Sequence, residues 1–477
     1  MKITVIGSGS IFFTRSIIKG MIEMPVFNGA ELALVDIDPG RNDAMGRFAE
    51  LARDFYGKND FKISYSTDRR EVLANSDYVI TTMSPMNAHL RGANASTVEN
   101  YGITEHSGQT AGPGMAFRVA YEVPLMLDVC KDIEELAPDA WVFNLVNPTN
   151  VTGTVVDRFT KLKTLTFCDA MYTPQSDAPD WSFGELIKIH AKLPVAPDIE
   201  NRDRFKIKVG GINHCVWMTD IEFDGKSVWK TFKDSIKKTA EKEGQESMAY
   251  GQYQLLEIFD ALPCAMGHTV EYVRYFQGLG GKRNKDYIIG KWDHTDRLRW
   301  TRAVWRDIDW CLEGKIDVPM ILDEQRIDML NYVIESMETG KEVIFPVNVR
   351  NEGRISNLPD DVLVELFGTF RKGGVDVPTY GKLPHGINGI IQQTVDYQEL
   401  ALEAAMEYDY EKLVRAVACD PLVMSLDDAK EITRELMAIY EPVMPKEWDF
   451  YWKDIVDEVR RDYLKEKGRF DMQAKRK

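Results

Sequence analysis

The first 36 residues constrain the fold of this chain more than any other stretch. Residues 2–6 form a short run of β-branched residues that is typical of a buried strand. This run leads into the turn Gly7-Ser8-Gly9-Ser10 and then into a helical pattern over residues 11–24. A second apolar run, residues 31–35, ends in Asp36. A strand, a glycine turn, a helix and a second strand in this order predict a βαβ nucleotide-binding unit.

The glycine turn favours a dinucleotide over an ordinary βαβ connection. It lets a pyrophosphate approach the amides at the N-terminus of the helix, where the helix dipole favours an anion. Asp36 follows at a distance comparable with the about 20 residues expected for a carboxylate that binds the ribose 2′-hydroxyl of NAD and repels the 2′-phosphate of NADP. Phe12 replaces the third glycine of the usual G-x-G-x-x-G pattern. We therefore predict that Gly7, Ser8, Gly9, Ser10 and Asp36 bind NAD.

Length, charge and cysteine content exclude several classes of protein. A chain of 477 residues is too long for one hydrophobic core, so we expect two lobes. The net charge of −16 argues against nucleic acid as a partner. No apolar run approaches the about 20 residues of a membrane span, and the chain opens on a strand where a signal peptide would need an apolar leader. We expect a cytoplasmic protein with no membrane partner and with scattered, mostly buried thiols in place of disulfides.

The remaining pattern predicts the α/β fold class. Further strand-like runs, separated by helical patterns, lie at residues 61–65, 78–83, 141–146 and 164–167. The longest helical pattern covers residues 119–136. This alternation predicts a mostly parallel, doubly wound Rossmann-type sheet in a first domain over residues 1–200. The later pattern predicts a mostly helical α+β domain over residues 201–477, with some β structure near residues 343–349.

Three predicted strands deliver polar residues to the sheet edge where ligands bind in doubly wound folds. One leads to Asn147-Pro148, where a nicotinamide and a substrate would meet. An equally good interpretation makes Asn147 the N-cap of a helix and Pro148 its first residue. Two others lead to Cys168 and to His214. A thiolate and an imidazole are both metal ligands, so this pair predicts a site for a divalent ion.

These motifs together resemble the NAD- and manganese-dependent glycosidases of glycoside hydrolase family 4, over nearly the whole chain. The matching segments, in order, are Gly7-Ser8-Gly9-Ser10, Val35-Asp36-Ile37-Asp38, Ala111-Gly112-Pro113-Gly114 with Arg118, Asn147-Pro148, Phe167-Cys168-Asp169, Gly211-Ile212-Asn213-His214, His268, Glu271-Tyr272, Phe276, Asn348-Val349-Arg350-Asn351-Glu352-Gly353, Asn357-Leu358-Pro359-Asp360-Asp361 and Gln398-Glu399-Leu400-Ala401. Each segment is weak alone, but their order and spacing are specific.

The resemblance implies an unusual route of glycoside hydrolysis. NAD removes hydride from C3 of the sugar, a base takes the C2 proton, and the glycosidic oxygen leaves by elimination before water adds and the steps reverse. A divalent ion, manganese above magnesium, would stabilise the charge across O2 and O3. The resemblance also implies a homodimer or homotetramer. Exposed-looking aromatic residues of the C-terminal lobe would support assembly unless they pack inside it; these are Trp448, Phe450, Tyr451 and Trp452.

Residue roles follow from the resemblance by position. Cys168 and His214 would bind the metal. Asn147 would bind a substrate hydroxyl beside the nicotinamide, and Asp169 would donate the proton to the leaving oxygen. Arg283 is also expected to bind the substrate, through a carboxylate or a phosphate group.

The base at C2 is assigned to Tyr272, and Tyr275 and His268 remain alternatives. His268 is also expected to contact the substrate. A tyrosine base needs its ordinary pKa of about 10 lowered, for which a nearby metal ion or arginine would suffice.

The substrate class is open at this point. The loop over residues 84–91 lacks the arginine-and-glycine pattern of phosphate-reading members, which favours an unphosphorylated α-hexoside or hexuronide over a 6-phospho-glycoside. Arginines that would clamp a carboxylate or phosphate are Arg91, Arg118, Arg274 and Arg283. The alternatives are a 6-phospho-glycosidase of the same family and a 2-hydroxyacid dehydrogenase of the lactate or malate type, which needs no metal-binding cysteine. A non-catalytic sensor is disfavoured because the site residues are all present.

Overall fold

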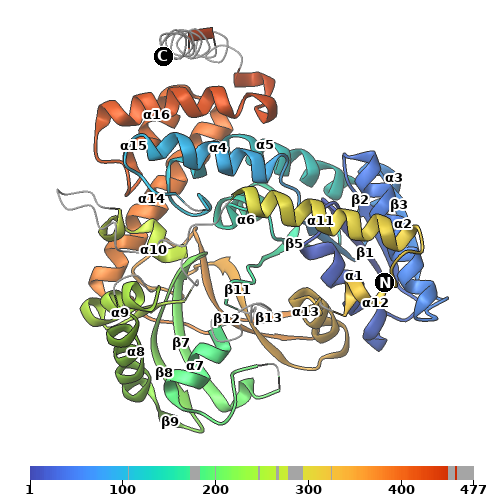
Figure 1. Cartoon of the computed structure of the whole chain (residues 1–477), viewed down its shortest axis with the longest axis horizontal. Coiled ribbons are helices and arrows are strands. Elements are labelled where there is room, and N and C mark those ends of the chain that lie inside the picture. The colour runs from blue at the N-terminus through green and yellow to red at the C-terminus, as the bar shows by residue number, and fades with distance from the viewer. Residues whose placement is uncertain are drawn as a thin grey trace, which may run out of the picture.

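The computed structural model describes residues 1–105, 107–171, 183–198, 200–244, 248–264, 268–277, 294–323, 325–448 and 457–458 (Figure 1). The strands are β1 (Lys2–Ile6), β2 (Glu31–Val35), β3 (Lys62–Ser66), β4 (Tyr78–Thr81), β5 (Trp141–Asn144), β6 (Lys163–Thr166), β7 (Phe205–Ile212), β8 (Cys215–Phe223), β9 (Lys226–Ser227), β10 (Leu262–Pro263), β11 (Val343–Arg350), β12 (Leu363–Arg371) and β13 (Gly374–Asp376).

The α-helices of these residues cover the sheet and build the far lobe. They are α1 (Phe13–Glu23), α2 (Pro39–Phe55), α3 (Arg69–Val72), α4 (Asn87–Glu99), α5 (Pro113–Leu136), α6 (Thr149–Phe159), α7 (Phe183–Ala191), α8 (Trp229–Glu243), α9 (Met248–Phe259), α10 (His268–Tyr272), α11 (His294–Leu312), α12 (Pro319–Leu322), α13 (Met329–Thr339), α14 (His385–Glu407), α15 (Tyr410–Cys419) and α16 (Leu426–Ile439).

The described strands join into one sheet with a parallel part and an antiparallel part. Its order is β10-β8-β7-β12-β11-β6-β5-β4-β1-β2-β3. The six strands from β6 to β3 pair in parallel, as the alternation of strands and helices predicts. The central strands β1, β4 and β5 are almost entirely buried because helices lie on both of their faces. The α/β fold class with a Rossmann-type sheet is confirmed.

The antiparallel part contains more β structure than the sequence suggested. β11 continues the sheet from β6 by pairing Asn348 with Thr166. β12, β7, β8 and β10 follow, all antiparallel. Strands buried on both faces show no alternation, so periodicity does not separate them from buried helix. The division expected at residue 200 falls between α7 and β7 and stays a prediction.

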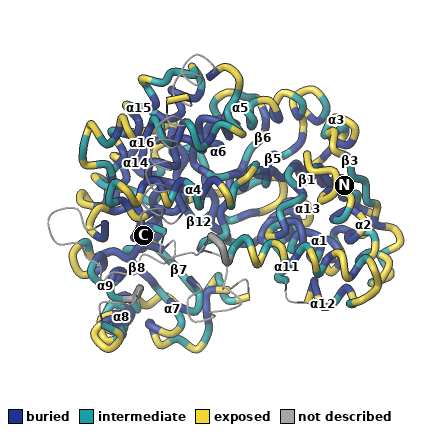
Figure 2. Tube along the Cα trace, turned by 45° about the horizontal axis from the view of Figure 1, so that its top comes forward, coloured by how far each residue is buried: buried dark blue, intermediate teal, exposed yellow. Residues whose placement is uncertain are grey.

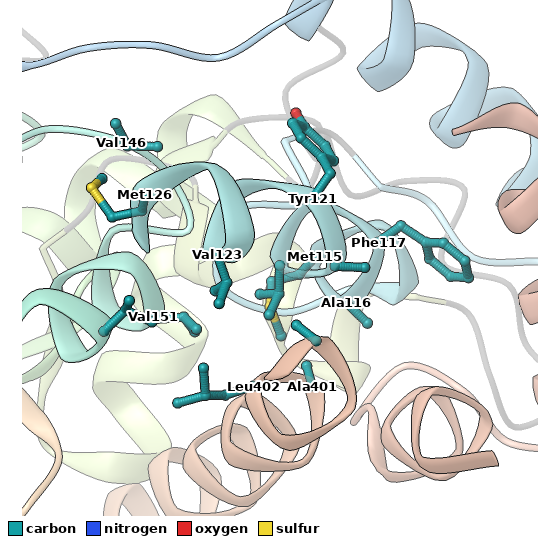
Figure 3. Packing of buried hydrophobic residues seen from close by; sticks show 14 of the residues in the cluster. Met115, Ala116, Phe117, Tyr121, Val123, Met126, Val146, Val151, Ala401 and Leu402 are labelled. Carbon is teal, nitrogen blue, oxygen red and sulfur yellow. The ribbon is translucent and has the colours of Figure 1, made fainter. Parts of the chain in front are cut away.

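One large core lies between α5 and the last helices of the chain. Figure 2 shows the buried interior of these elements, and in Figure 3 Met115, Ala116 and Val123 of α5 face Ala401 and Leu402 of α14. α5 begins at Pro113, earlier than expected, because proline suits the first turn of a helix. α15 and α16 extend the same core.

The aromatic residues expected on the surface of the C-terminal lobe need a correction. Trp448 is only 1% exposed, and its indole Nε1 donates to the carbonyl of Ala120 at 3.4 Å. Its ring packs edge-on against Tyr408. The expectation that Trp448 supports assembly is wrong because its ring fills the core beside α5. Phe450 to Trp452 lie outside the described residues.

A second core lies on the opposite face of the parallel strands. It combines α1 and α2 with α11 to α13, which come from the later part of the chain. Gly20 of α1 allows Asn331 of α13 to pack directly on the helix backbone, where the Asn331 amide donates to the Ile17 carbonyl at 3.3 Å.

In the described part of the chain, we find no helix whose length and apolar character would let it cross a membrane.

Candidate active site

The glycine turn after β1 has the conformation that the sequence predicts. Gly7 has a φ of +94°, and a Cβ there would lie 2.5 Å from the backbone nitrogen of Met83. Only glycine avoids both the strained backbone and the clash. α1 starts at Phe13, and the side chain of Phe12 is 45% exposed. Phe12 can therefore replace the third glycine of the pattern, because its ring points to solvent and does not have to fit between the helix and the strand. The buried Ser8 hydroxyl donates to Asn42 at 2.9 Å and fixes the turn on α2.

Asp36 faces the glycine turn from the end of β2. One carboxylate oxygen accepts from the Gly9 amide at 2.8 Å and the other from the Asp38 amide at 2.9 Å. A Cβ on Gly9 would lie 2.6 Å from Asp36 Oδ2. The glycine turn and the carboxylate that the sequence predicts to bind NAD therefore lie side by side.

Cys168 and His214 come together although 46 residues separate them. The Cys168 Sγ lies 3.0 Å from His214 Nε2, and both side chains are buried. Cys168 follows β6, and His214 occupies the turn between β7 and β8 with a left-handed φ of +61°. The Thr269 hydroxyl donates to the His214 carbonyl at 2.8 Å and helps to hold this strained conformation. The two predicted metal ligands thus form one site.

The electrostatics of this pair suit a cation. Burial raises the pKa of the Cys168 thiol and lowers the pKa of His214, with His268, Arg91 and Arg118 adding to the latter shift. A divalent ion would oppose the Cys168 shift by stabilising the thiolate, and it would bind the neutral imidazole that burial of His214 already favours. Within the described residues, no third His, Cys, Asp or Glu joins them as a metal-binding group. Two protein ligands leave positions open for the oxygen ligands that Mn²⁺ prefers.

Asn147 and Asp169 lie at neighbouring strand ends of the same sheet edge, after β5 and β6. The Asn147 carbonyl accepts from Arg118 Nη2 at 3.1 Å, and its side-chain oxygen accepts from the Thr149 hydroxyl at 2.8 Å. α6 begins at Thr149 with Pro148 in the N-cap position, so the alternative of Asn147 as N-cap is wrong. Asp169 is half-buried directly beside Cys168.

The three candidates for the base differ in burial and in their distance from the Cys168–His214 pair. The Tyr272 ring is 1% exposed and lies parallel to the His268 ring, which in turn stacks on His214 with centroids 4.7 Å apart. Tyr275 is 46% exposed and packs against Phe259. The structure therefore brings Tyr272 and His268 to the Cys168–His214 pair but not Tyr275. Burial and the Glu271 carboxylate raise the pKa of Tyr272, which is opposite to the lowering that a simple tyrosinate base requires.

Two of the four predicted arginines lie buried near this pair. Arg91 on α4 and Arg118 on α5 are both buried, whereas Arg274 is exposed and Arg283 lies outside the described residues. Burial, together with the charges of Arg297 and Arg118, lowers the pKa of Arg91 to about 9. Positive side chains therefore lie near the pair together with the carboxylates of Asp169, Glu271 and Glu365, which act on the same groups.

Comparison with known proteins agrees with this geometry. A model described as family 4 glycosyl hydrolase matches residues 2–178, and a model of the family 4 glycosyl hydrolase C-terminal domain matches residues 209–423. The chain belongs to glycoside hydrolase family 4. The match through the C-terminal half argues against the 2-hydroxyacid dehydrogenase alternative.

The relatives of this family 4 enzyme carry several substrate names. An α-galactosidase of Bacillus subtilis is 27% identical over 458 residues, which are 93% of this chain and 99% of the relative. An α-galacturonidase of Thermoanaerobacterium saccharolyticum is 26% identical over 463 residues, or 92% and 95%. The fold matches the crystal structure of a 6-phospho-α-glucosidase from gut microorganisms in complex with NAD and Mn²⁺ (TM-score 0.75, 21% identity, 93% and 99% coverage).

Several residues around the family 4 site were not predicted from sequence. Arg297 on α11 acts on Arg118 and Arg91 through its charge, and Thr110 lies 3.4 Å from His214 Nδ1. Glu365 on β12 accepts from Asn213 Nδ2 at 3.1 Å, and burial raises its pKa to about 7. A charged residue inside an apolar run, such as Glu365 within β12, is the one sequence signal that could have pointed to such a site.

Proposed function

We propose that this glycosidase cleaves α-hexuronides or other unphosphorylated α-hexosides with NAD and a divalent ion, manganese above magnesium, bound in the site. The turn over residues 7–10 and Asp36 would hold NAD, and Cys168 and His214 would hold the metal. When bound, NAD supplies reversible hydride transfer at C3 and the metal supplies charge stabilisation at O2 and O3. The presence of NAD and Mn²⁺ in the gut 6-phospho-α-glucosidase supports both cofactors.

The residues of the chain then divide the proton transfers between them. Asp169 donates a proton to the glycosidic oxygen as it leaves, and Tyr272 removes the proton from C2. Asn147 binds a sugar hydroxyl at the sheet edge. His268 contacts the substrate from its position over the His214 ring, 4.7 Å between centroids. Arg283 remains a predicted substrate ligand outside the described residues.

The surroundings of Arg118 are the observation on which we base the proposed substrate class. Its Nη2 donates to Ser84 and to the Asn147 carbonyl, but Nε and Nη1 are buried without a hydrogen-bond partner among the described residues. Leaving buried charged donors unpaired is costly, so a ligand group is expected there. Nε–H and Nη1–H point to different sides of the guanidinium group, so each needs its own acceptor atom, and an anionic group such as a carboxylate would also match the charge. This supports a hexuronide above a neutral hexoside, as does the α-galacturonidase relative.

The test is a panel of aryl α- and β-hexosides, hexuronides and 6-phosphohexosides, run in deuterated water with NAD, Mn²⁺ and a thiol. We expect the highest kcat/KM for an α-hexuronide and deuterium at C2 of the product. Arg118→Lys should raise the KM for the hexuronide roughly 10–100-fold, because lysine lacks the Nε and Nη1 donors that would bind the charged substrate. The exposed Arg274→Lys is the matched control and should leave KM unchanged.

Two results would contradict this proposal. Preference for 6-phosphohexosides would assign the buried arginines to phosphate, which is the alternative within the family. A product without deuterium at C2, or full activity after removal of metal and NAD, would exclude the elimination route.

We also propose that the enzyme is a homodimer or homotetramer. The resemblance to the family supports this, and exposed apolar side chains such as Met424 (61%) and Leu426 (71%), which neighbour each other in sequence, suit a contact. Sedimentation at micromolar concentration should show more than one subunit. A monomer would refute it.

A further inference from the structure

A chain of hydrogen bonds leads from Tyr272 to a buried carboxylate. The Tyr272 hydroxyl lies 2.8 Å from the Ser107 hydroxyl, which donates to Glu271. Glu271 also accepts from the Ser107 amide at 2.9 Å. Because Ser107 has one hydroxyl proton and gives it to the carboxylate, the Tyr272 hydroxyl is the donor in its contact with Ser107. Glu271 and Thr110 also interact with the Tyr272 hydroxyl.

The three residues of this hydrogen-bond network are buried. Ser107, Glu271 and Tyr272 are each at most 2% exposed. The Gln277 amide donates to the carbonyls of Glu271 and Thr104, and so ties the segment before Ser107 to α10. The groups that face Glu271 electrostatically are His268, with Nδ1 at 3.7 Å, and Arg91 and Glu105 through their charges.

We propose that Ser107 and Glu271 form a proton relay behind Tyr272 and that Glu271 is the final acceptor of the C2 proton. This inference rests on the proposed function. As the C2–H bond breaks, its electron pair stays on the sugar and its proton moves to Tyr272. The hydroxyl proton of Tyr272 moves to Ser107, and the hydroxyl proton of Ser107 moves to Glu271.

The relay conserves atoms and charge, and it explains how Tyr272 can act as a base although its pKa is raised. One C–H and two O–H bonds break while three O–H bonds form, and the negative charge passes from Glu271 to the sugar. Tyr272 never becomes a free tyrosinate, so its raised pKa does not prevent it from acting at C2. The reverse transfer returns a proton to C2 in the second half of the cycle.

A purely structural role for Glu271 makes a different prediction. Glu271 docks the Ser107 amide onto α10, and glutamine at this position keeps an oxygen that accepts from that amide. Glutamine does not take up a proton at neutral pH. Glu271→Gln therefore preserves docking and removes the acceptor.

The experiment uses the full-length enzyme with NAD, Mn²⁺ and the best glycoside of the panel. We expect Glu271→Gln to lower kcat by about 100-fold or more, a typical loss for general base catalysis, and to slow deuterium exchange at C2 by a similar factor. NADH absorbance should build up, because C3 is still oxidised while C2 keeps its proton. Ser107→Ala should show the same pattern, and thermal midpoints and Mn²⁺ binding should stay at wild-type values.

Gln277→Ala is the matched control, since it cuts the docking of the loop and leaves the relay intact. It should lower the thermal midpoint but keep C2 exchange at the wild-type rate. Wild-type exchange in Glu271→Gln would overturn the relay alone. Equal loss of exchange in Glu271→Gln and Gln277→Ala, with the same thermal shift, would assign Glu271 a structural role and also overturn it. No exchange in the wild-type enzyme with any glycoside would overturn the proposed function as well.

Discussion

The glycine turn and the Cys168–His214 pair build their parts of the site in different ways. The turn is made by backbone conformation within four residues, and Asp36 joins it directly from the next strand. The pair is made by side chains from two segments and is held by buried threonines, such as Thr269. The turn, which we call the proposed cofactor end of the site, therefore depends on local geometry. The pair, the proposed reactive end, depends on tertiary packing.

The largest effects are expected at the reactive end. Cys168→Ser and His214→Ala should each reduce metal-dependent activity by at least about 100-fold, because even partners of a metal ligand are worth 10–100-fold. Both residues follow strand ends, so the fold should survive. Electron paramagnetic resonance of bound Mn²⁺, with thermal melting, measures both points. The exposed Cys419→Ser is the control, and variants with wild-type Mn²⁺ affinity would place the ligands elsewhere.

Gly7→Ala tests whether the proposed cofactor end depends on the backbone conformation of the glycine turn. The left-handed φ and the approach of Met83 should together destabilise the enzyme by about 2–5 kcal/mol and weaken NAD binding. Gly57→Ala is the control, since Gly57 has a φ of +68° but open space around it. It should show only the backbone strain of about 1–2 kcal/mol. Denaturant unfolding and NAD titration measure both, and equal losses would mean that the approach to Met83 is unimportant.

Glu122 on α5, next to Ser84, allows a test of how the stability of the enzyme depends on pH. Its carboxylate accepts from Ser84 at 2.7 Å, and burial raises its pKa from 4.5 to about 7. The folded state then binds more protons than the unfolded state between these values. The free energy of unfolding therefore falls as pH rises through this window and levels off above it.

Glu122→Gln should remove this dependence. The stability of the variant relative to wild type should rise by about 3 kcal/mol between pH 4.5 and 7, as measured by urea unfolding of the apoenzyme. A parallel pair of stability curves would show that Glu122 stays ionised in the folded enzyme.

The smallest effect is expected from Tyr275→Phe. The Tyr275 ring is 46% exposed and should keep its contact with Phe259, so stability should change by less than about 0.5 kcal/mol and activity should be unchanged. Tyr272→Phe should instead abolish deuterium exchange at C2. Loss of exchange in Tyr275→Phe would instead assign the role of the base to the exposed Tyr275 ring.

These contrasts also explain what the sequence could predict. β1, β2, β4 and β5 are short apolar runs between turn signals, so their order and parallel pairing follow from local pattern. The same pattern places Cys168 and Asn147 at the carboxyl ends of parallel strands, where ligands gather in such folds, and their roles stay predictions. β12, with its buried charge, was missed.

The residues around the reactive end were harder to predict. Ser107 and Arg297 stand in segments without a motif. Hydrogen bonds to α10 bring Ser107 to the site, and the packing of α11 on α2 and α4 brings Arg297 close enough to act on Arg118. The opposite shift of the Tyr272 pKa likewise follows from burial, which no spacing reveals.

The packing of α14, α15 and α16 on α5 has a consequence for the synthesis of this enzyme. α5 is complete at residue 136, but its partner α14 begins only at residue 385. At about 5–20 residues per second, the ribosome needs roughly 10–50 s to deliver it. During that interval the nascent chain carries the apolar face of α5 without its cover, so we expect the first half of the protein to depend on chaperones until translation is nearly finished.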